Sequence, residues 1–323
     1  MARFRHALLD PRPGEPAARS NAALLGPNTL GVEVTEPRLA AQCGLGNIDP
    51  QHRPGGGALA AIEAALDWPV PPAGATLVTI RPDADAYGAM AVLGLRVAGV
   101  VITSPMRERI AAIARADRFD RGAWPGVRVL PATAADVDEI GPGEQGVGGL
   151  AAGLGDRALC AEAGVAAVRA WIATAEAPMD WRQRAAGAAE ALCAALASGR
   201  VRLSAVDPGR IALVEGCVPG ALRLGYRLAP VVVALDDAPR GTPPAPWRRI
   251  TVAQWRTGYV DLLRAAALLG SEEPGWGGAP GIIGSPQGSP CRRTLAQVFA
   301  ALRTSGGCDN RTHDREEPIH DPA

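Results

Sequence analysis

The sequence contains no lysine: each of its 33 lysine-or-arginine side chains is an arginine. This absence excludes the enzyme classes whose chemistry depends on a lysine amine, namely P-loop nucleotide hydrolases, pyridoxal enzymes that form a Schiff base, and protein kinases. Any anion that the protein binds must therefore be met by arginine, backbone amides or a metal ion. The 33 acidic residues balance the arginines, so the total charge gives no indication of nucleic-acid binding.

Two further absences concern paired cysteines and long apolar runs. The six cysteines include no Cys-x-x-Cys pair, which excludes the common zinc spacings and a disulfide framework. Residues 1–13 have no apolar core of signal-peptide length, and no run approaches the roughly 18 apolar residues of a membrane span. We therefore expect a cytoplasmic protein with no membrane partner. The oligomeric state stays open, with a homodimer among the alternatives.

The chain is long enough for two domains, with 323 residues and 47% hydrophobic content. The pattern predicts an α/β protein: a Rossmann-like domain with a parallel sheet, a smaller α/β domain, and a cleft between them. One short strand is expected at 100–103. The predicted boundaries are a first domain over 1–150, a helical linker over 151–199, a second domain over 200–303 and a disordered tail over 304–323.

The stretch 76–88 carries the clearest local pattern. A short apolar run at 77–80 predicts a strand, and apolar residues at helical spacing follow it. Asp83 and Asp85 lie in the turn between them, which a parallel sheet would place where open α/β folds bind ligands. Two carboxylates two residues apart can face one divalent cation. In the plainer interpretation, Asp85 caps the helix and Asp83 occupies the turn.

Two loops offer further metal ligands. Asp49 and His52 lie three residues apart in a loop bounded by glycines, and the other histidines lie near the termini. Asp117 and Arg118 begin a turn rich in Asp and Arg after a predicted helix at 106–116. The plainer alternatives are a solvent-exposed histidine and an ordinary salt-bridged surface turn.

A glycine-rich stretch at 275–288 holds six glycines in fourteen residues. Such a backbone can approach a ligand closely and donate its amide hydrogens to an anion. Gly277, Gly278, Gly284 and the adjacent Ser285 are therefore candidate substrate-binding residues. A plain hairpin is the alternative.

These motifs together resemble those of the DHH-family phosphoesterases, whose members hydrolyse oligonucleotides, cyclic dinucleotides, polyphosphate or pyrophosphate. Residues 83–89, after a strand and a proline, are similar to the first motif of the family. Residues 48–52 resemble its Asp-His-His motif, and residues 113–117 its later aspartate motif. Residues 277–284 are similar to the glycine-rich loop of the DHH-associated C-terminal domain, so the resemblance touches both halves of the chain.

The chain departs from the pattern of the family at three points. Thr79 and Ala279 stand where the family has histidines, and the Asp49–His52 pair precedes the Asp-x-Asp motif instead of following it. The resemblance therefore implies a divergent or permuted relative.

The resemblance implies a metal-dependent phosphoesterase that cleaves a phosphodiester or phosphoanhydride with a metal-activated water. Its substrate would be a phosphorylated small molecule or an oligonucleotide. The alternatives are an inactive relative that binds a nucleotide or phosphorylated ligand, and an α/β interaction protein without a site. The expected residues are the Mn²⁺ or Mg²⁺ ligands Asp49, His52, Asp83, Asp85 and Asp117; the catalytic His52 and Asp117; and the substrate-binding Arg81, Arg118, Gly277, Gly278, Gly284 and Ser285.

Overall fold

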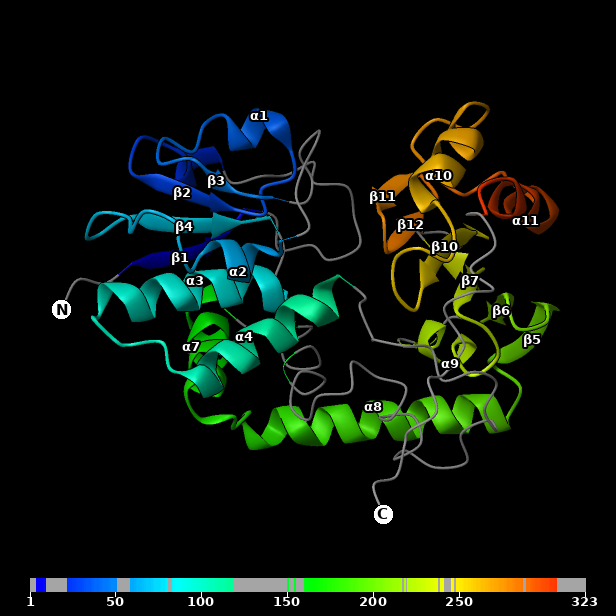
Figure 1. Cartoon of the computed structure of the whole chain (residues 1–323), viewed down its shortest axis with the longest axis horizontal. Helices are drawn as coiled ribbons and strands as arrows, with labels where there is room; N and C mark the ends of the chain where they lie inside the picture. The colour runs from blue at the N-terminus through cyan, green and yellow to red at the C-terminus, as the bar shows by residue number, and fades with distance from the viewer. Residues whose placement is uncertain are drawn as a thin grey trace, which may run out of the picture.

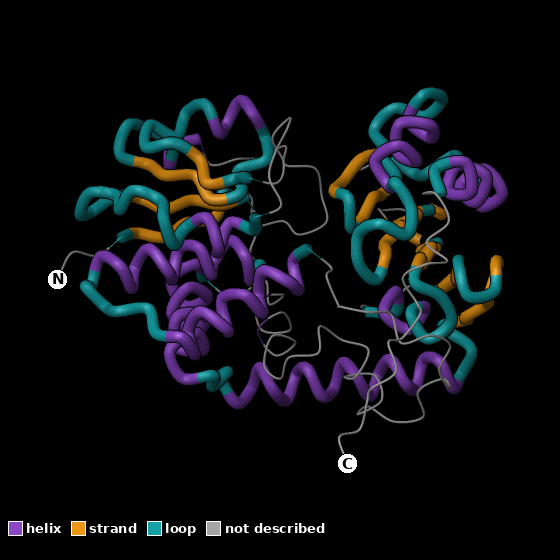
Figure 2. The backbone as a smooth tube through the Cα atoms, in the orientation of Figure 1, coloured by secondary structure: helices purple, strands orange, loops and turns teal. Residues whose placement is uncertain are grey.

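The computed structural model describes residues 4–9, 22–50, 59–80, 83–118, 150, 154, 160–216, 218, 220–237, 239–240, 245–246, 248–286 and 289–306. The described elements form two lobes, each built around its own sheet (Figure 1). Figure 2 shows the strands of the two lobes as separate groups, with a long helix running below both. That helix is α8 (Met179–Ala197). The α/β class expected from the sequence is confirmed.

The first lobe contains a four-stranded parallel sheet with the order β1-β4-β2-β3. Leu77 of β4 packs into a core with the helices on one face of the sheet, whereas Val78 packs with Leu39 of α1 on the other face. Burial of both faces explains why the consecutive residues Leu77 and Val78 are both apolar. The elements are β1 (Arg5–Leu8), η1 (Ala22–Leu24), β2 (Thr29–Val32), α1 (Pro37–Ala40), β3 (Asn47–Ile48), α2 (Ala61–Ala64), β4 (Thr76–Thr79), α3 (Ala84–Val97), α4 (Ser104–Asp117) and α7 (Ala161–Thr174).

The second lobe contains a six-stranded sheet with the order β11-β12-β10-β7-β6-β5. Strands β6 and β7 are parallel, and the other neighbours are antiparallel. Helices α10 and α11 cover one face, and α9 with the end of α8 covers the other. The elements are β5 (Arg202–Asp207), β6 (Ile211–Glu215), α9 (Leu222–Gly225), β7 (Val231–Asp236), β10 (Arg249–Gln254), α10 (Leu262–Gly270), β11 (Gly277–Ala279), β12 (Ile282–Gly284), α11 (Leu295–Thr304) and a separate pair, β8 (Pro239–Arg240) and β9 (Ala245–Pro246).

The structure differs from the sequence expectations at two connections. The prediction of a strand at 100–103 is wrong. This segment joins α3 to α4 outside the sheet, and Val101 is 79% exposed. None of the strands that the structure describes pairs with this segment. Helix α7, expected within the linker, packs instead on α3, and its Val168 and Trp171 belong to the first core.

None of the helices in the described part of the chain combines the length and the hydropathy that a membrane crossing requires.

Candidate metal centre

Five carboxylates gather at the carboxyl edge of the parallel sheet. Glu33 directly follows β2, Asp49 follows β3, Asp83 and Asp85 begin α3 after β4, and Asp117 is the last residue of α4. The strands are parallel, so their carboxyl ends meet at one edge, and residues far apart in sequence come together there. Carboxylate oxygens of Glu33, Asp85 and Asp117 lie within 4.8 Å of one another.

Asp85 is the most deeply buried member, with 1% of its surface exposed. Its oxygens accept hydrogen bonds from the backbone amides of Ala61 at 2.7 Å and Ile62 at 2.9 Å, both in the first turn of α2. Burial raises the pKa of the Asp85 carboxyl well above its ordinary value, and the charges of Asp117 and Asp83 add to this; the two amides act in the opposite direction. A cation in the cluster would remove the repulsion and favour the charged form.

Asp83 holds the start of α3 and is the exposed member of the cluster. Its side chain accepts a hydrogen bond from the Ala86 amide at 2.8 Å and so caps the helix. The plainer interpretation, with Asp85 as the cap, is therefore wrong. The cap places Asp83 beside Asp85, close enough for its charge to raise the pKa of Asp85.

Glu33 is a member of the cluster that the sequence analysis missed. Its φ of 51° is left-handed, which is uncommon for a residue with a side chain and costs on the order of 1 kcal/mol or more. Its amide donates to the Ile48 carbonyl at 2.9 Å, and this pairing holds the turn. Burial raises the pKa of Glu33 well above its ordinary value. The charges of Asp83, Asp85, Asp117 and Asp49 raise it further.

A signal for Glu33 exists in the sequence. It directly follows an apolar strand, as Asp83 follows β4 after a short turn. The structure ends β2 at Val32, and Glu33 turns away from the strand.

The structure brings together the predicted residues Asp49, Asp83, Asp85 and Asp117. Asp49 is buried, with 5% of its surface exposed, and it lies close enough to raise the pKa of Glu33. The predicted residues His52 and Arg81 lie outside the described residues.

Arg118 is expected to neutralise phosphate, but in the structure it forms an ion pair with Glu63 of α2. This pair ties the end of α4, and with it Asp117, to the helix whose amides hold Asp85. The arginine therefore has a structural role at the edge of the cluster.

The glycine-rich stretch forms the β11–β12 hairpin, at the edge of the second sheet on the side toward the first lobe (Figure 1). Gly278 has a φ of 147°, and a Cβ there would collide with the Ile282 carbonyl oxygen, so the hairpin itself requires this glycine. Buried Ser285 pairs with Ile250: its amide donates to the Ile250 carbonyl at 2.8 Å, and its hydroxyl accepts from the Ile250 amide at 3.1 Å. A Cβ on Gly277 would meet no atom within 4 Å, so a ligand could approach the backbone at Gly277.

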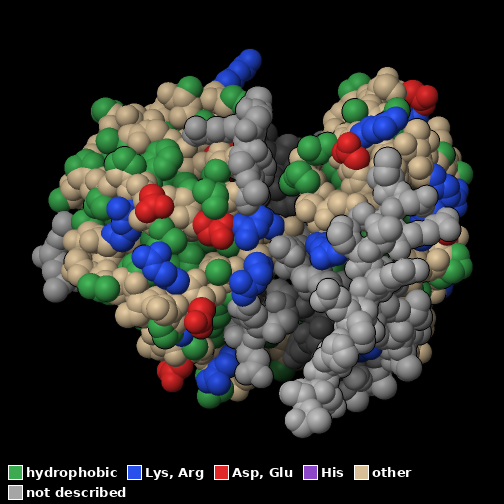
Figure 3. Space-filling view, viewed as in Figure 1, with side chains coloured by type: hydrophobic (Ala, Val, Ile, Leu, Met, Phe, Trp, Pro, Cys, Tyr) green, Lys and Arg blue, Asp and Glu red, His purple; other side chains and the backbone are tan. Residues whose placement is uncertain are grey.

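In the space-filling view the surface is hollowed between the two lobes, and both arginine and acidic side chains lie along the rim formed by the first lobe (Figure 3).

Comparison with known proteins gives no family. No protein-family model matches the chain, and no curated protein matches it. The chemistry of the cluster therefore has to be argued from its own atoms.

The donor set fits a hard divalent cation. All the ligand atoms that the described cluster offers are carboxylate oxygens, which suit magnesium and manganese better than zinc. The fit also has an electrostatic basis, because several acids in one partly buried space repel each other until a cation or protons neutralise them.

Proposed function

We propose that this protein is a metal-dependent phosphoesterase whose carboxylate cluster holds Mn²⁺ or Mg²⁺. The observation that carries the proposal is the approach of the Glu33, Asp85 and Asp117 oxygens to within 4.8 Å of one another at the ligand-binding edge of a parallel sheet. The similarity of residues 83–89 to the first DHH motif supports the same class of reaction.

Divalent ions, when bound, would polarise a phosphoryl oxygen and lower the pKa of a water molecule for attack on phosphorus. Asp85, fixed by two backbone amides, would be the rigid ligand of the site. Asp83 would serve from the solvent side, because the helix cap orients its carboxylate while the side chain stays exposed. Glu33 and Asp117 would complete the ligand set from β2 and α4.

The substrate would be a phosphorylated small molecule or an oligonucleotide lying between the lobes. Its phosphate would bind the metal held by the carboxylate cluster, and the rest of the molecule would extend toward the β11–β12 hairpin. Gly277 is the hairpin position where a ligand could approach the backbone, because no neighbouring atom fills the space of a Cβ there.

Hydrolysis of bis-p-nitrophenyl phosphate tests the proposal. Wild-type protein should release p-nitrophenol with added Mn²⁺ and lose this activity in EDTA, and Asp85→Asn should be inactive with Mn²⁺ present. Asp261→Asn is the control and should keep wild-type activity, since it is the same substitution at the cap of α10 in the second lobe, away from the carboxylate cluster. Mn²⁺ binding without hydrolysis of this or other phosphoesters would favour the alternative of a protein that binds a phosphorylated ligand.

A further inference from the structure

A second concave region lies at the carboxyl ends of β6 and β7, in the second lobe. These strands are parallel neighbours, and the chain leaves the sheet at Gly216, which has a φ of 139°. A Cβ on Gly216 would lie 2.5 Å from the Arg200 carbonyl oxygen, so this sharp exit requires glycine. Two pockets, of about 310 Å³ and about 410 Å³, share Gly216 and Leu235 in their walls.

The register of the sheet assigns the two pockets to opposite faces. In the larger pocket, Arg249 pairs with Asp236 and Thr251 with Ala234, so these side chains project on the face that α9 covers. In the smaller pocket, Glu215 pairs with Leu235 in register, on the other face.

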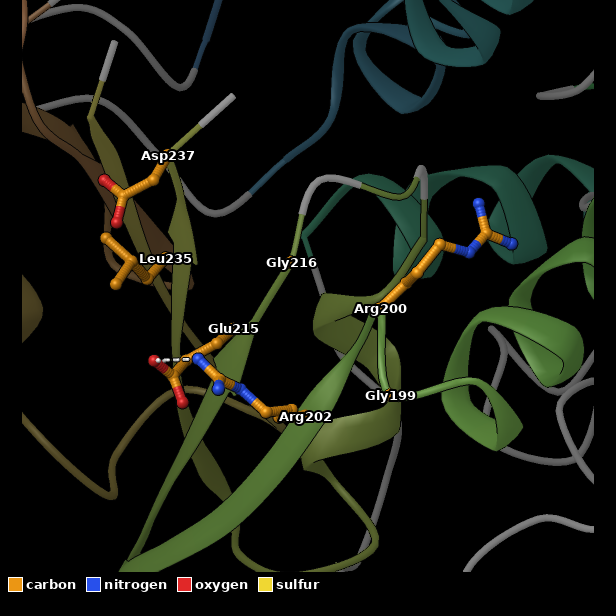
Figure 4. A pocket seen from close by; sticks show the side chains of 7 residues that line it. All are labelled: Gly199, Arg200, Arg202, Glu215, Gly216, Leu235 and Asp237. Atoms are coloured by element: carbon orange, nitrogen blue, oxygen red, sulfur yellow. Dashed lines mark hydrogen bonds and ion pairs between the residues drawn. The ribbon is translucent and has the colours of Figure 1, made fainter. Parts of the chain in front are cut away.

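The charges of the smaller pocket are mostly paired. Arg202 contacts Glu215 at 3.2 Å, and Asp237 contacts Arg248 at 3.1 Å. Figure 4 shows the Arg202 and Glu215 side chains pointing toward each other, while Arg200 points away from them. This pocket offers little charge to a ligand.

Arg249 of the larger pocket differs from these arginines. Within the described residues, its guanidinium has no hydrogen bond and no ion pair, although Asp236 lies directly opposite it in register. The side chain is half-buried, so it has lost part of its water without gaining an anion. A guanidinium in this position can bind a carboxylate or phosphate group with two hydrogen bonds.

The remainder of the larger pocket is apolar, apart from the Thr251 hydroxyl and Asp236. Val218 and Leu222 line the side formed by α9 and the loop before it, and Ala234 lies on the floor. The volume of about 410 Å³ falls among the roughly 300–1,000 Å³ of small-molecule sites. Asp236 also lines the pocket but has an interaction of its own, and the rest of the wall is apolar and faces the Arg249 cation. Such a lining suits an organic anion better than a bare inorganic ion.

We propose that the larger pocket binds a small organic anion, with its phosphate or carboxylate group on Arg249 and its apolar body against Val218 and Leu222. This site contains none of the carboxylates of the metal centre and needs no metal. It is therefore independent of the proposed hydrolysis.

The test is calorimetric titration of the full chain in EDTA with phenyl phosphate, benzoate and the uncharged benzyl alcohol. At least one of the two anions should bind, and the comparison between them distinguishes phosphate from carboxylate. Benzyl alcohol should bind about tenfold more weakly or not at all, because it cannot pair with the guanidinium. Absence of binding by both anions would overturn the proposal.

Variants locate the binding site. Arg249→Gln should weaken anion binding about tenfold or more, and Arg249→Lys should weaken it less, because it keeps the charge but loses the bidentate geometry. Arg264→Gln, which removes an equal charge from an exposed position of α10, should bind as the wild type does. Unchanged affinity in Arg249→Gln would place the anion elsewhere.

Two further variants keep the test decisive. Asp85→Asn should retain anion binding, which separates this pocket from the metal centre; loss of binding there would contradict an independent site. Val218→Glu adds an opposing carboxylate from a loop, without altering β10, and should weaken binding even if Arg249→Gln does not fold. Thermal unfolding of each variant checks that the lobe is intact.

Discussion

The Asp85 carboxylate accepts a hydrogen bond from the Ile62 amide at 2.9 Å, so the first turns of α2 and α3 meet at one buried acid. Because the Ala61 amide donates to its other oxygen, a backbone amide binds each side of the carboxylate. Asp85 therefore has a structural role and a proposed metal-binding role at once, and substitutions must separate the two.

Asp85→Asn should destabilise the protein without metal by up to about 1–3 kcal/mol, because the amide nitrogen of Asn cannot accept the second backbone hydrogen bond; the loss of a buried repelling charge offsets part of this cost. It should also abolish stabilisation by Mn²⁺. In the wild type, saturating Mn²⁺ should raise the free energy of unfolding by about 2.7–4.1 kcal/mol at 100–1,000 times its Kd. Denaturant unfolding with and without Mn²⁺ measures both effects; a variant that keeps the full Mn²⁺ effect would contradict the assignment.

Asp83→Asn should separate the helix cap from the charge. Asn caps helices about as well as Asp, so the free energy of unfolding in EDTA should change by no more than about 0.5 kcal/mol. Mn²⁺ affinity should fall, because a negative ligand is lost. Titration of Mn²⁺ by calorimetry checks this, with Asp261→Asn, another helix cap, expected to bind Mn²⁺ like the wild type.

Glu33→Gln should have opposite effects on stability and on metal binding. Without metal, the substitution removes one of the mutually repelling acids and should raise the free energy of unfolding. With Mn²⁺, it removes a ligand and should weaken binding. Glu190→Gln on the exposed side of α8 is the control, and neither quantity should change there. A Glu33→Gln protein that is less stable in EDTA would argue against the repulsion.

The raised pKa values of Glu33 and Asp85 predict the pH dependence of stability. Both carboxyls bind a proton more tightly in the folded than in the unfolded chain, so folding is favoured while they stay protonated. In EDTA their contribution should therefore be lost as the pH rises from their ordinary values of 4.5 and 3.8 through the raised folded values.

Two measurements check this sign. Denaturant unfolding in EDTA over a pH series should show a smaller loss with rising pH for Glu33→Gln than for the wild type. Mn²⁺ affinity should instead increase with pH, because the ion displaces protons from its ligands. Equal pH slopes for the two proteins would mean that Glu33 does not titrate as the structure indicates.

The two hairpin glycines should respond differently to substitution. Gly278→Ala should be clearly destabilising, because of its φ of 147° and the collision of the Cβ with the Ile282 carbonyl oxygen. Gly277→Val should leave the melting temperature nearly unchanged, since its Cβ projects into open space. If Gly277 faces the substrate, this variant should raise KM for an oligonucleotide while Mn²⁺ affinity stays constant. An unchanged KM would remove Gly277 from the substrate site.

Local pattern alone determined much of the secondary structure. The apolar run at 77–80 and the helical spacing after it predicted β4 and α3, because these signals depend on neighbours within a few residues. The proximity of Asp83 to Asp85 was also visible in the sequence, since only one residue separates them.

The tertiary structure alone decided which acids meet. Glu33 follows β2, Asp85 lies in α3 after β4, and Asp117 ends α4. The parallel pairing of β2 with β4 brings the first two to one edge, and the packing of α4 on α2 and α3 adds Asp117. It also decided that Asp83 rather than Asp85 caps α3, because α2 supplies the amides that bind Asp85. Local periodicity reports which face of an element is buried, but strand order and register arise from contacts between distant segments, so the composition of the cluster could not be read along the chain.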